Sequence, residues 1–509
     1  MLIKTYGAAL FGIDATTVII EVNIDMGIGY HLVGLPDNAV KESSYRIMAA
    51  LKNTGYKLPG KKIIINMAPA DLRKEGTAYD LPITLGILAA SGQIHCSNLH
   101  EYIIMGELSL DGGLHPIKGA LPIAIQMQKE GFKHFILPQP NALEASVVSG
   151  IDILAAQHLS EVIEHFTGAT PLTTVVTDPA IFCQYSNAYT MDFSDVKGQE
   201  GIKRCMEIAA AGGHNLLLIG PPGAGKTMLA KRLPTILPPM TLEEALETTK
   251  IHSVTGVRSH AGLVQVRPFR APHHTISDVA LVGGGQYPQP GEISLAHNGV
   301  LFLDELPEFK RSVLEVMRQP LEDRNVTISR AKFTVNYPSS FMLIASMNPS
   351  PSGYFPGSNQ FPAPSSYEMQ RYLQKLSGPL LDRIDMHVEV LPVPFDKLTT
   401  KNHSENSETI RKRVCQAREL QTIRFQSSPN IHYNAQMSSA QLHHHCALSP
   451  ACLALIKTAM KQLALSARAY DKILKVSRTI ADLDQSPTLK EQHLSEAILY
   501  RSLDRTHWF

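Results

Sequence analysis

The chain has 509 residues, of which 44% are hydrophobic and 18% charged, with a formal net charge of +1. Because this length exceeds what one hydrophobic core supports, we expect two to four domains. The balanced charge excludes nucleic-acid binding by overall charge, and no apolar run approaches the roughly 18 residues of a membrane span.

The cysteines and the N-terminus indicate the compartment. Six cysteines are scattered along the chain without a C-x-x-C pair. This usage argues against a disulfide framework or a zinc ribbon and is typical of a reducing compartment. The N-terminal stretch is only weakly apolar and does not form a convincing signal peptide. We therefore expect a cytoplasmic protein without a membrane anchor.

Alternating strand and helix patterns predict a compact α/β or α+β domain over residues 1–165. Short β-branched runs indicate its strands, and apolar residues at helical spacing indicate its helices. The predicted strands are Thr17–Val22, Ile63–Ile65, Tyr102–Met105 and His134–Leu137, and the predicted helices are Ala39–Asn53, Pro82–Ala90 and Ala120–Lys129.

Two segments of this domain, Ile63–Leu88 and Met105–Ile123, resemble the catalytic segments of the Lon protease domain. The resemblance implies a serine nucleophile at the position of Ala78 and a lysine base at the position of Pro122. Alanine carries no nucleophile and proline no titratable amine. We therefore predict a Lon-like α+β fold without protease activity.

Residues 166–192 are rich in threonine and proline and are predicted to be a linker. A helix is expected at Gly201–Ala211, followed by a buried parallel strand at Leu216–Ile219. The next eight residues match G-x-x-x-x-G-K-[ST], and Met228–Leu233 begins a helix. This order of strand, glycine-rich loop and helix predicts a phosphate-binding loop. Its residues are Gly220, Pro221, Pro222, Gly223, Ala224, Gly225, Lys226 and Thr227.

A second apolar strand, Val300–Leu303, ends in two carboxylates. In a site for ATP and Mg²⁺, Lys226 would reach the β- and γ-phosphates and Thr227 would ligate the metal. Asp304 would hold Mg²⁺ through its water shell, and Glu305 would polarise the attacking water. The sequence therefore predicts an ATP hydrolase that uses Mg²⁺.

A third strand, Phe341–Ala345, is followed by Asn348, and the three strands together resemble the AAA+ family. That resemblance implies that Asn348 orients the attacking water and that Arg383 reaches the nucleotide of a neighbouring subunit. The alternative for Arg383 is an ion pair within the chain, with Asp382 or Asp385.

Two insertions separate these strands: His252 to about Gln286, and a predicted β-hairpin from about Arg324 to Pro338. In AAA+ motors with a helix-2 insert and a pre-sensor hairpin, such loops project into a central pore, where basic residues grip a phosphate backbone. The alternative is that the basic residues are solvated or form structural pairs. The candidate DNA contacts are Arg267, Arg270, Arg330 and Lys332.

The last part of the chain is predicted to be helical and resembles the lid of AAA+ proteins. In that lid an arginine at the start of a helix contacts the γ-phosphate, which Arg468 fits, while Arg478 is the lesser candidate. The predicted helices are Glu408–Arg424, Ala451–Leu465, Ile473–Asp484 and Leu489–Leu503.

Four segments together identify the chain as similar, end to end, to the bacterial magnesium-chelatase-related ATPases of the YifB/ComM family. They are Arg267–Gly285, Gly291–Phe309, Leu376–Asp385 and Ser466–Leu483. The resemblance implies a Lon-like domain over 1–165, a linker over 166–192, an AAA+ core with helix-2 insert and pre-sensor hairpin over 193–395, and a helical lid over 396–509.

The same resemblance implies a homohexameric ring that moves single-stranded or branched DNA. Branch migration during homologous recombination and natural transformation, with recombination proteins as possible partners, is the expected activity. The alternatives are a protein-remodelling motor and a metal-chelatase motor subunit.

Overall fold

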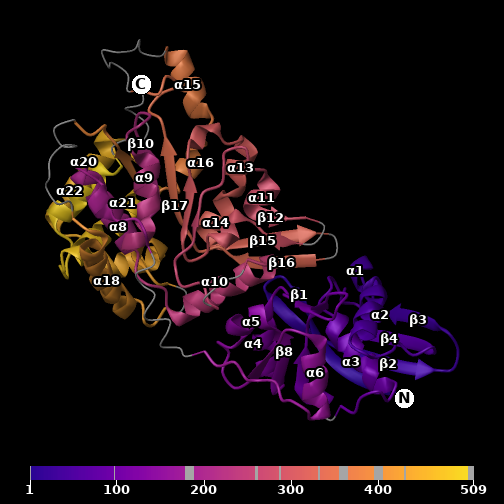
Figure 1. The fold of residues 1–509 in the computed structure, drawn as a ribbon. Coiled ribbons are helices and arrows are strands. Elements are labelled where there is room, and N and C mark those ends of the chain that lie inside the picture. Colours follow the sequence, from indigo (N-terminus) through magenta and orange to yellow (C-terminus); the bar gives the residue numbers. More distant parts are fainter. Residues whose placement is uncertain are drawn as a thin grey trace. The chain divides into compact units, whose positions relative to one another are not determined.

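The structure is a computed structural model that describes residues 2–96, 98–177, 189–257, 262–285, 288–330, 333–354, 365–394, 405–428 and 431–501. It divides into two compact units (Figure 1). Unit 1 comprises Met1–Ser186 and Thr241–Gln265, and unit 2 comprises Asn187–Met240 and Val266–Phe509. The chain therefore passes between the units three times.

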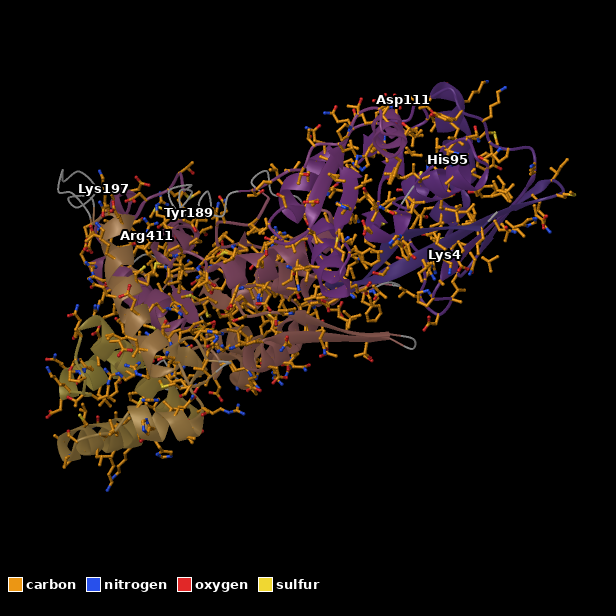
Figure 2. The ribbon with its side chains drawn as sticks, turned by 90° about the horizontal axis from the view of Figure 1, so that it is seen from below. Lys4, His95, Asp111, Tyr189, Lys197 and Arg411 are labelled. Carbon is orange, nitrogen blue, oxygen red and sulfur yellow. The ribbon has the colours of Figure 1, made fainter. Side chains whose placement is uncertain are left out.

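Unit 1 begins with a four-stranded sheet in the order β1-β2-β4-β3 (Figure 1). β1 (Leu2–Phe11) pairs antiparallel with β2 (Asp14–Asp25) along its whole length. Lys4 (labelled in Figure 2) lies 3.0 Å from Glu21 across this pair. The sequence analysis missed β1 because three small residues in succession, Gly7 to Ala9, are all buried and obscure the two-residue period. β4 (Lys62–Ala68) pairs antiparallel with β2 and parallel with β3 (Gly29–Val33).

Helices bury one face of this sheet. Every residue of α3 (Asp80–Ala90) is buried, and α3 packs against β1 and β2, while α4 (Ala120–Glu130) packs against β2. A second, parallel sheet has the order β5-β8-β9. The remaining α-helices and strands of residues 2–177 are α1 (Asn38–Lys41), α2 (Ser43–Asn53), β5 (Tyr102–Ile104), β6 (Glu107–Leu108), β7 (Leu114–His115), β8 (His134–Pro138), α5 (Gln139–Ala145), β9 (Asp152–Ala156) and α6 (Leu159–Thr167).

The predicted linker over 166–192 is partly ordered against unit 1. Leu154 of β9 bridges to Thr174, and the Val175 amide donates to the Ile153 carbonyl over 2.8 Å. Residues 178–188 of the predicted linker lie outside the described residues.

The predicted ATPase core over 193–395 is not contiguous, because Thr241–Gln265 belongs to unit 1. α10 (Leu242–Thr255), which begins with a capping box between Thr241 and Glu244, packs against α4. The Gly119 amide donates to the Ser253 carbonyl over 3.2 Å. The segment that leaves unit 2 therefore begins at Thr241, before His252, where the sequence analysis expected an insertion to start. The sequence analysis missed α10 because threonines interrupt its apolar face.

Unit 2 is built on a five-stranded parallel sheet in the order β11-β14-β17-β10-β18. The three strands expected around the nucleotide site are confirmed at the centre of this sheet. Their bounds are β10 (Leu216–Ile219), β14 (Val300–Leu303) and β17 (Met342–Met347), and the flanking strands are β11 (Phe269–Arg270) and β18 (Met386–Glu389).

Helices from both parts of unit 2 share one core. α8 (Glu200–Gly212) packs against α18 (Ser407–Arg424) and α21 (Ala467–Leu483). Among the described residues, no helix is long and apolar enough to cross a membrane. The other helices of unit 2 are α9 (Lys226–Arg232), α11 (Asp278–Val282), α12 (Glu292–Leu295), α13 (Arg311–Val316), α14 (Arg318–Asp323), α15 (Ser366–Gln374), α16 (Gly378–Leu381), α19 (Ser439–His445), α20 (Pro450–Gln462) and α22 (Glu491–Leu499).

The predicted hairpin is present as β15 (Asn325–Arg330) and β16 (Phe333–Pro338), which pair only with each other in the described part of the chain (Figures 1 and 2). The side chains of Val326, Ile328, Val335 and Tyr337 are buried. The hairpin is therefore anchored by one apolar face.

A buried carboxylate joins the sheet to the C-terminal helices. Asp385, directly before β18, forms an ion pair with Lys472 of α21 and accepts the Asn215 amide over 2.8 Å. Burial by itself would raise the pKa of Asp385, but the charge of Lys472 and the contact with His214 hold that pKa below its ordinary value. The carboxylate is therefore ionised and depends on its partners.

We expect Lys472→Met to lower the free energy of unfolding by about 3 kcal/mol, since it leaves the buried Asp385 carboxylate without its ammonium partner. Denaturant unfolding of the full chain measures this. The double variant Lys472→Met/Asp385→Asn should recover part of the loss. Equal stability of Lys472→Met and the wild type would contradict the conclusion that the buried Asp385 carboxylate depends on Lys472.

Candidate functional site

The phosphate-binding loop connects β10 to α9, and backbone geometry explains its glycines. Gly223 and Gly225 have φ of 78° and 88°, a region that L-residues with side chains avoid. A Cβ on Gly220 would lie 2.2 Å from the Val390 carbonyl oxygen. The loop therefore has the open backbone that lets N–H groups surround phosphate oxygens.

Lys226, at the start of α9, lies over this loop. Its ammonium donates to the Pro221 carbonyl over 3.0 Å and to Asn348 Oδ1 over 3.1 Å. Burial lowers the pKa of Lys226, although the nearby Asp304 and Glu305 act in the opposite direction. Lys226 and Asn348 are thus brought together at the position expected for the γ-phosphate.

Two oxygen donors suited to Mg²⁺ meet beside the loop. The Thr227 hydroxyl donates to Asp304 Oδ2 over 2.7 Å. Carboxylate and hydroxyl oxygens are the ligands that Mg²⁺ prefers, so this donor set fits the metal. The Ser346 hydroxyl holds the other oxygen, Oδ1, of Asp304. Sequence reasoning missed Ser346, whose only signal is its place two residues before Asn348.

Glu305 has a strained backbone and an exposed carboxylate. Its φ of 54° lies in the left-handed region, which costs a non-glycine residue roughly 1 kcal/mol. Its amide donates to Asp304 Oδ1 over 3.1 Å and approaches Ser346 Oγ at 3.3 Å, which stabilises this conformation. The Glu305 carboxylate lies 3.5 Å from His274 Nδ1.

His274 is therefore a contact of the site, which the sequence analysis did not predict. Its ring lies 4.0 Å from that of His273 and packs edge-on against Phe309. No group of three or more metal-ligating side chains gathers among the described residues, here or elsewhere.

The three arginines considered at the nucleotide site have different surroundings. Arg383 follows α16, and its guanidinium lies 2.6 Å from Glu322 and donates to the Pro379 carbonyl over 2.7 Å. Arg468 is exposed in the first turn of α21. Arg478 is buried, paired with Asp482 of the same helix.

Two of the candidate DNA contacts are engaged within the chain. Arg267 donates to the carbonyls of Pro238 over 2.6 Å and Asn298 over 2.7 Å. Arg270 forms a bidentate pair with Glu292, at 2.6 and 2.7 Å. For both residues the structure supports the alternative of structural pairs. Sequence reasoning could not find these partners, because the carbonyls bound by Arg267 leave no pattern in a sequence and Glu292 lies 22 residues from Arg270.

The structure describes the backbone of one of the other two candidates. Arg330 is the last residue of β15, and Lys332 lies outside the described residues. The described exposed side chains of the hairpin are polar and uncharged, with cross-strand contacts from Thr327 to Asn336 at 2.8 Å and from Ser329 to Thr334 at 3.2 Å. Hydroxyl and amide groups of this kind can bind phosphate oxygens.

In unit 1 the Lon-like segments carry no catalytic pair. Ala78 is half-buried before α3, and its carbonyl accepts the Gly106 amide over 2.8 Å. Pro122 is buried in the first turn of α4. Neither side chain can act as nucleophile or base.

Three family models match the chain. One described as "Magnesium chelatase, subunit ChlI" matches residues 192–398, "Subunit ChlI of Mg-chelatase" matches 20–141, and "Magnesium chelatase, subunit ChlI C-terminal" matches 404–501. Together they cover both units.

Two relatives match along almost the whole chain, and a third matches over less than a third of it. Competence protein ComM of Haemophilus influenzae is 45% identical over 505 residues, 98% of this chain and 97% of that protein. Uncharacterized protein YifB of Escherichia coli is 45% identical over 499 residues, 98% of this chain and 96% of that protein. Lon protease 2 of Bacillus subtilis is 29% identical over 161 residues, 28% of this chain and 27% of that protein.

We expect Glu305→Gln to bind ATP with unchanged affinity and to hydrolyse it at least about 100-fold more slowly, because the amide keeps the shape but cannot accept a proton. Nucleotide binding and phosphate release measure the two properties. Glu308→Gln is the matched control, since Glu308 pairs with Lys375 at 2.9 Å and not with the site. Unchanged hydrolysis by Glu305→Gln would exclude Glu305 as the base.

Proposed function

Because the chain belongs to the magnesium-chelatase-related ATPase family of ComM and YifB, we propose that it is an ATP-driven DNA motor. The observation that carries the proposal is the convergence of Lys226, Thr227 and Asp304 at one edge of the sheet. Branch migration of DNA during homologous recombination is the proposed activity. The name of the relative Competence protein ComM supports natural transformation as its setting.

The loop backbone and Lys226 bind the phosphates of ATP. Lys226 exchanges its present carbonyl partners for β- and γ-phosphate oxygens, and Thr227 and Asp304 hold Mg²⁺. When bound by Thr227 and Asp304, Mg²⁺ would supply positive charge against the phosphates. Glu305 accepts the proton of the attacking water, and Asn348, already in contact with Lys226, orients that water.

Arginines complete the site in this proposal. Arg468 contacts the γ-phosphate of its own subunit, and Arg383 contacts the nucleotide of the next subunit in a homohexameric ring. The guanidinium stabilises the charge spread over the transferred phosphoryl group. Arg383 then leaves Glu322, an exchange made easier because the Glu322 carboxylate is half-exposed.

The hairpin supports DNA as the substrate. Its exposed face offers hydroxyl and amide groups, and Arg330 ends the first strand. Together with Lys332, these groups would hold a phosphate backbone without reading its sequence. Single-stranded and branched DNA are the proposed partners, with recombination proteins at the same substrates, in the cytoplasm.

We expect a four-way DNA junction to accelerate ATP hydrolysis severalfold. Raising salt from about 50 to about 200 mM should suppress the acceleration, because ions compete for phosphate contacts. Steady-state turnover with and without junction measures this, and Glu305→Gln serves as the inactive control. Turnover that is normal but indifferent to every DNA would favour the alternatives, a protein-remodelling or metal-chelatase motor subunit.

If Arg383 acts on the neighbouring subunit, Arg383→Ala and Lys226→Ala are each inactive alone, but mixing them restores activity. About a quarter of the interfaces in a 1:1 mixture combine an intact phosphate loop with an intact Arg383, so about a quarter of the wild-type rate is expected.

Glu322→Gln is the control for this experiment, because it removes the in-chain partner of Arg383 and should leave hydrolysis intact. A mixture that stays inactive, or a Glu322→Gln variant as inactive as Arg383→Ala, would show that the pair with Glu322 is the role of Arg383.

A further inference from the structure

Tyr433 lies between two arginines from distant parts of unit 2. Its ring centroid is 4.3 Å from the guanidinium carbon of Arg418 in α18 and 5.3 Å from that of Arg324. Cations over an aromatic face at such distances are attracted by the ring quadrupole. The Tyr433 hydroxyl also contacts Ser340 Oγ at 3.1 Å.

Both contacts on one side of Tyr433 belong to the base of the β15–β16 hairpin. Arg324 directly precedes β15, and Ser340 follows β16 by two residues. Arg324 has φ of 54°, and its carbonyl accepts the Ser339 amide over 2.8 Å, which closes the base of the hairpin. Since the hairpin pairs with no other described strand, contacts at its base act together with its buried apolar face to set its direction.

The other side of Tyr433 belongs to the nucleotide-binding part of the unit. A Cβ on Gly213 would lie 2.4 Å from the Tyr433 ring, so the ring packs against the turn between α8 and β10. Arg418 also donates to the Ala210 carbonyl over 2.9 Å at the end of α8. β10 in turn leads directly into the phosphate-binding loop.

The residue after Tyr433 is tied to α21, the helix that carries Arg468. The Asn434 side-chain amide donates to Asp482 over 2.8 Å, and Asp482 also accepts from Arg424 of α18 over 2.7 Å. The Asn434 backbone amide donates to the side-chain oxygen of Gln421 over 2.9 Å. Tyr433 is therefore held by the C-terminal helices while it contacts the base of the hairpin.

We propose that Tyr433 is a positioning residue that transmits nucleotide-dependent movement of the C-terminal helices to the β15–β16 hairpin. Nucleotide binding and DNA binding are then coupled through it. Coupling is reciprocal, so DNA must tighten nucleotide by the same factor by which nucleotide tightens DNA. This inference rests on the proposed DNA motor and adds the path by which the two ligands act on each other.

The test measures that factor in the full chain. The affinity for a non-hydrolysable ATP analogue is determined with and without a four-way DNA junction, and the affinity for the junction with and without the analogue. The wild type should show a coupling factor on the order of 10. Tyr433→Leu should bring the factor close to 1 while each separate affinity stays within about twofold.

Two further variants set the scale. Tyr433→Phe keeps the ring between the arginines and loses only the contact with Ser340, so it should retain most of the coupling. Tyr500→Leu is the matched control: Tyr500 is also half-buried in the C-terminal part, but its hydroxyl contacts Glu496 of the same segment. It should leave the coupling factor unchanged.

The outcomes separate the two proposals. A wild type whose nucleotide affinity and turnover ignore every DNA overturns the DNA motor, and this inference with it. A wild type with coupling that Tyr433→Leu retains in full overturns the role of Tyr433 alone. If Tyr433→Leu does not fold, Arg324→Gln decides, since it leaves the ring in place: loss of coupling supports the inference and full coupling overturns it.

Discussion

The parallel register of β10, β14 and β17 is the constraint on which the proposed nucleotide site depends. Ile219 pairs with Met347, and Leu303 pairs with Ala345, so the carboxyl ends of the three strands meet at one edge. The phosphate loop, the two acidic residues and Asn348 each begin where a strand ends. A shift of one residue would turn the side chains of a strand to the opposite face and separate Thr227 from Asp304.

The arginines of unit 2 show how a half-buried charge is accommodated. A guanidinium removed from water needs hydrogen-bond acceptors, and both carbonyl and carboxylate oxygens can serve as acceptors. Arg267 is the clearest case. It lies just after the segment that leaves unit 2, and it binds the carbonyls of Pro238 and Pro239 just before that segment. Arg267 therefore links the two points at which the segment containing α10 leaves and re-enters unit 2.

Unit 1 contains the segment that is similar in sequence to Lon protease 2, and its helices are buried against its first sheet. α3 is buried on every side, and apart from Asp80, which pairs with Arg46, and Thr84 its residues are apolar or glycine, so packing constrains most of its sequence. α10 belongs to unit 1, although the residues before and after its segment belong to unit 2. The Ser253 carbonyl accepts the Gly119 amide, and the Ser253 hydroxyl donates to Glu144. The chain therefore connects unit 2 to unit 1 at both ends of the segment that contains α10, in addition to the connection after Ser186.

The sequence by itself determined the phosphate loop, the acidic residues after β14 and the strand before Asn348, because each is a short local pattern with a chemical reason for its residues. The prediction that unit 1 lacks protease activity rests on the resemblance that places Ala78 and Pro122 at the catalytic positions. The partners of Arg267, Arg270 and Arg383, the contact of His274 with Glu305, and the assignment of α10 to unit 1 were decided only by the tertiary structure. They join residues far apart in the chain, or use backbone carbonyls that every residue carries, and neither leaves a local signal.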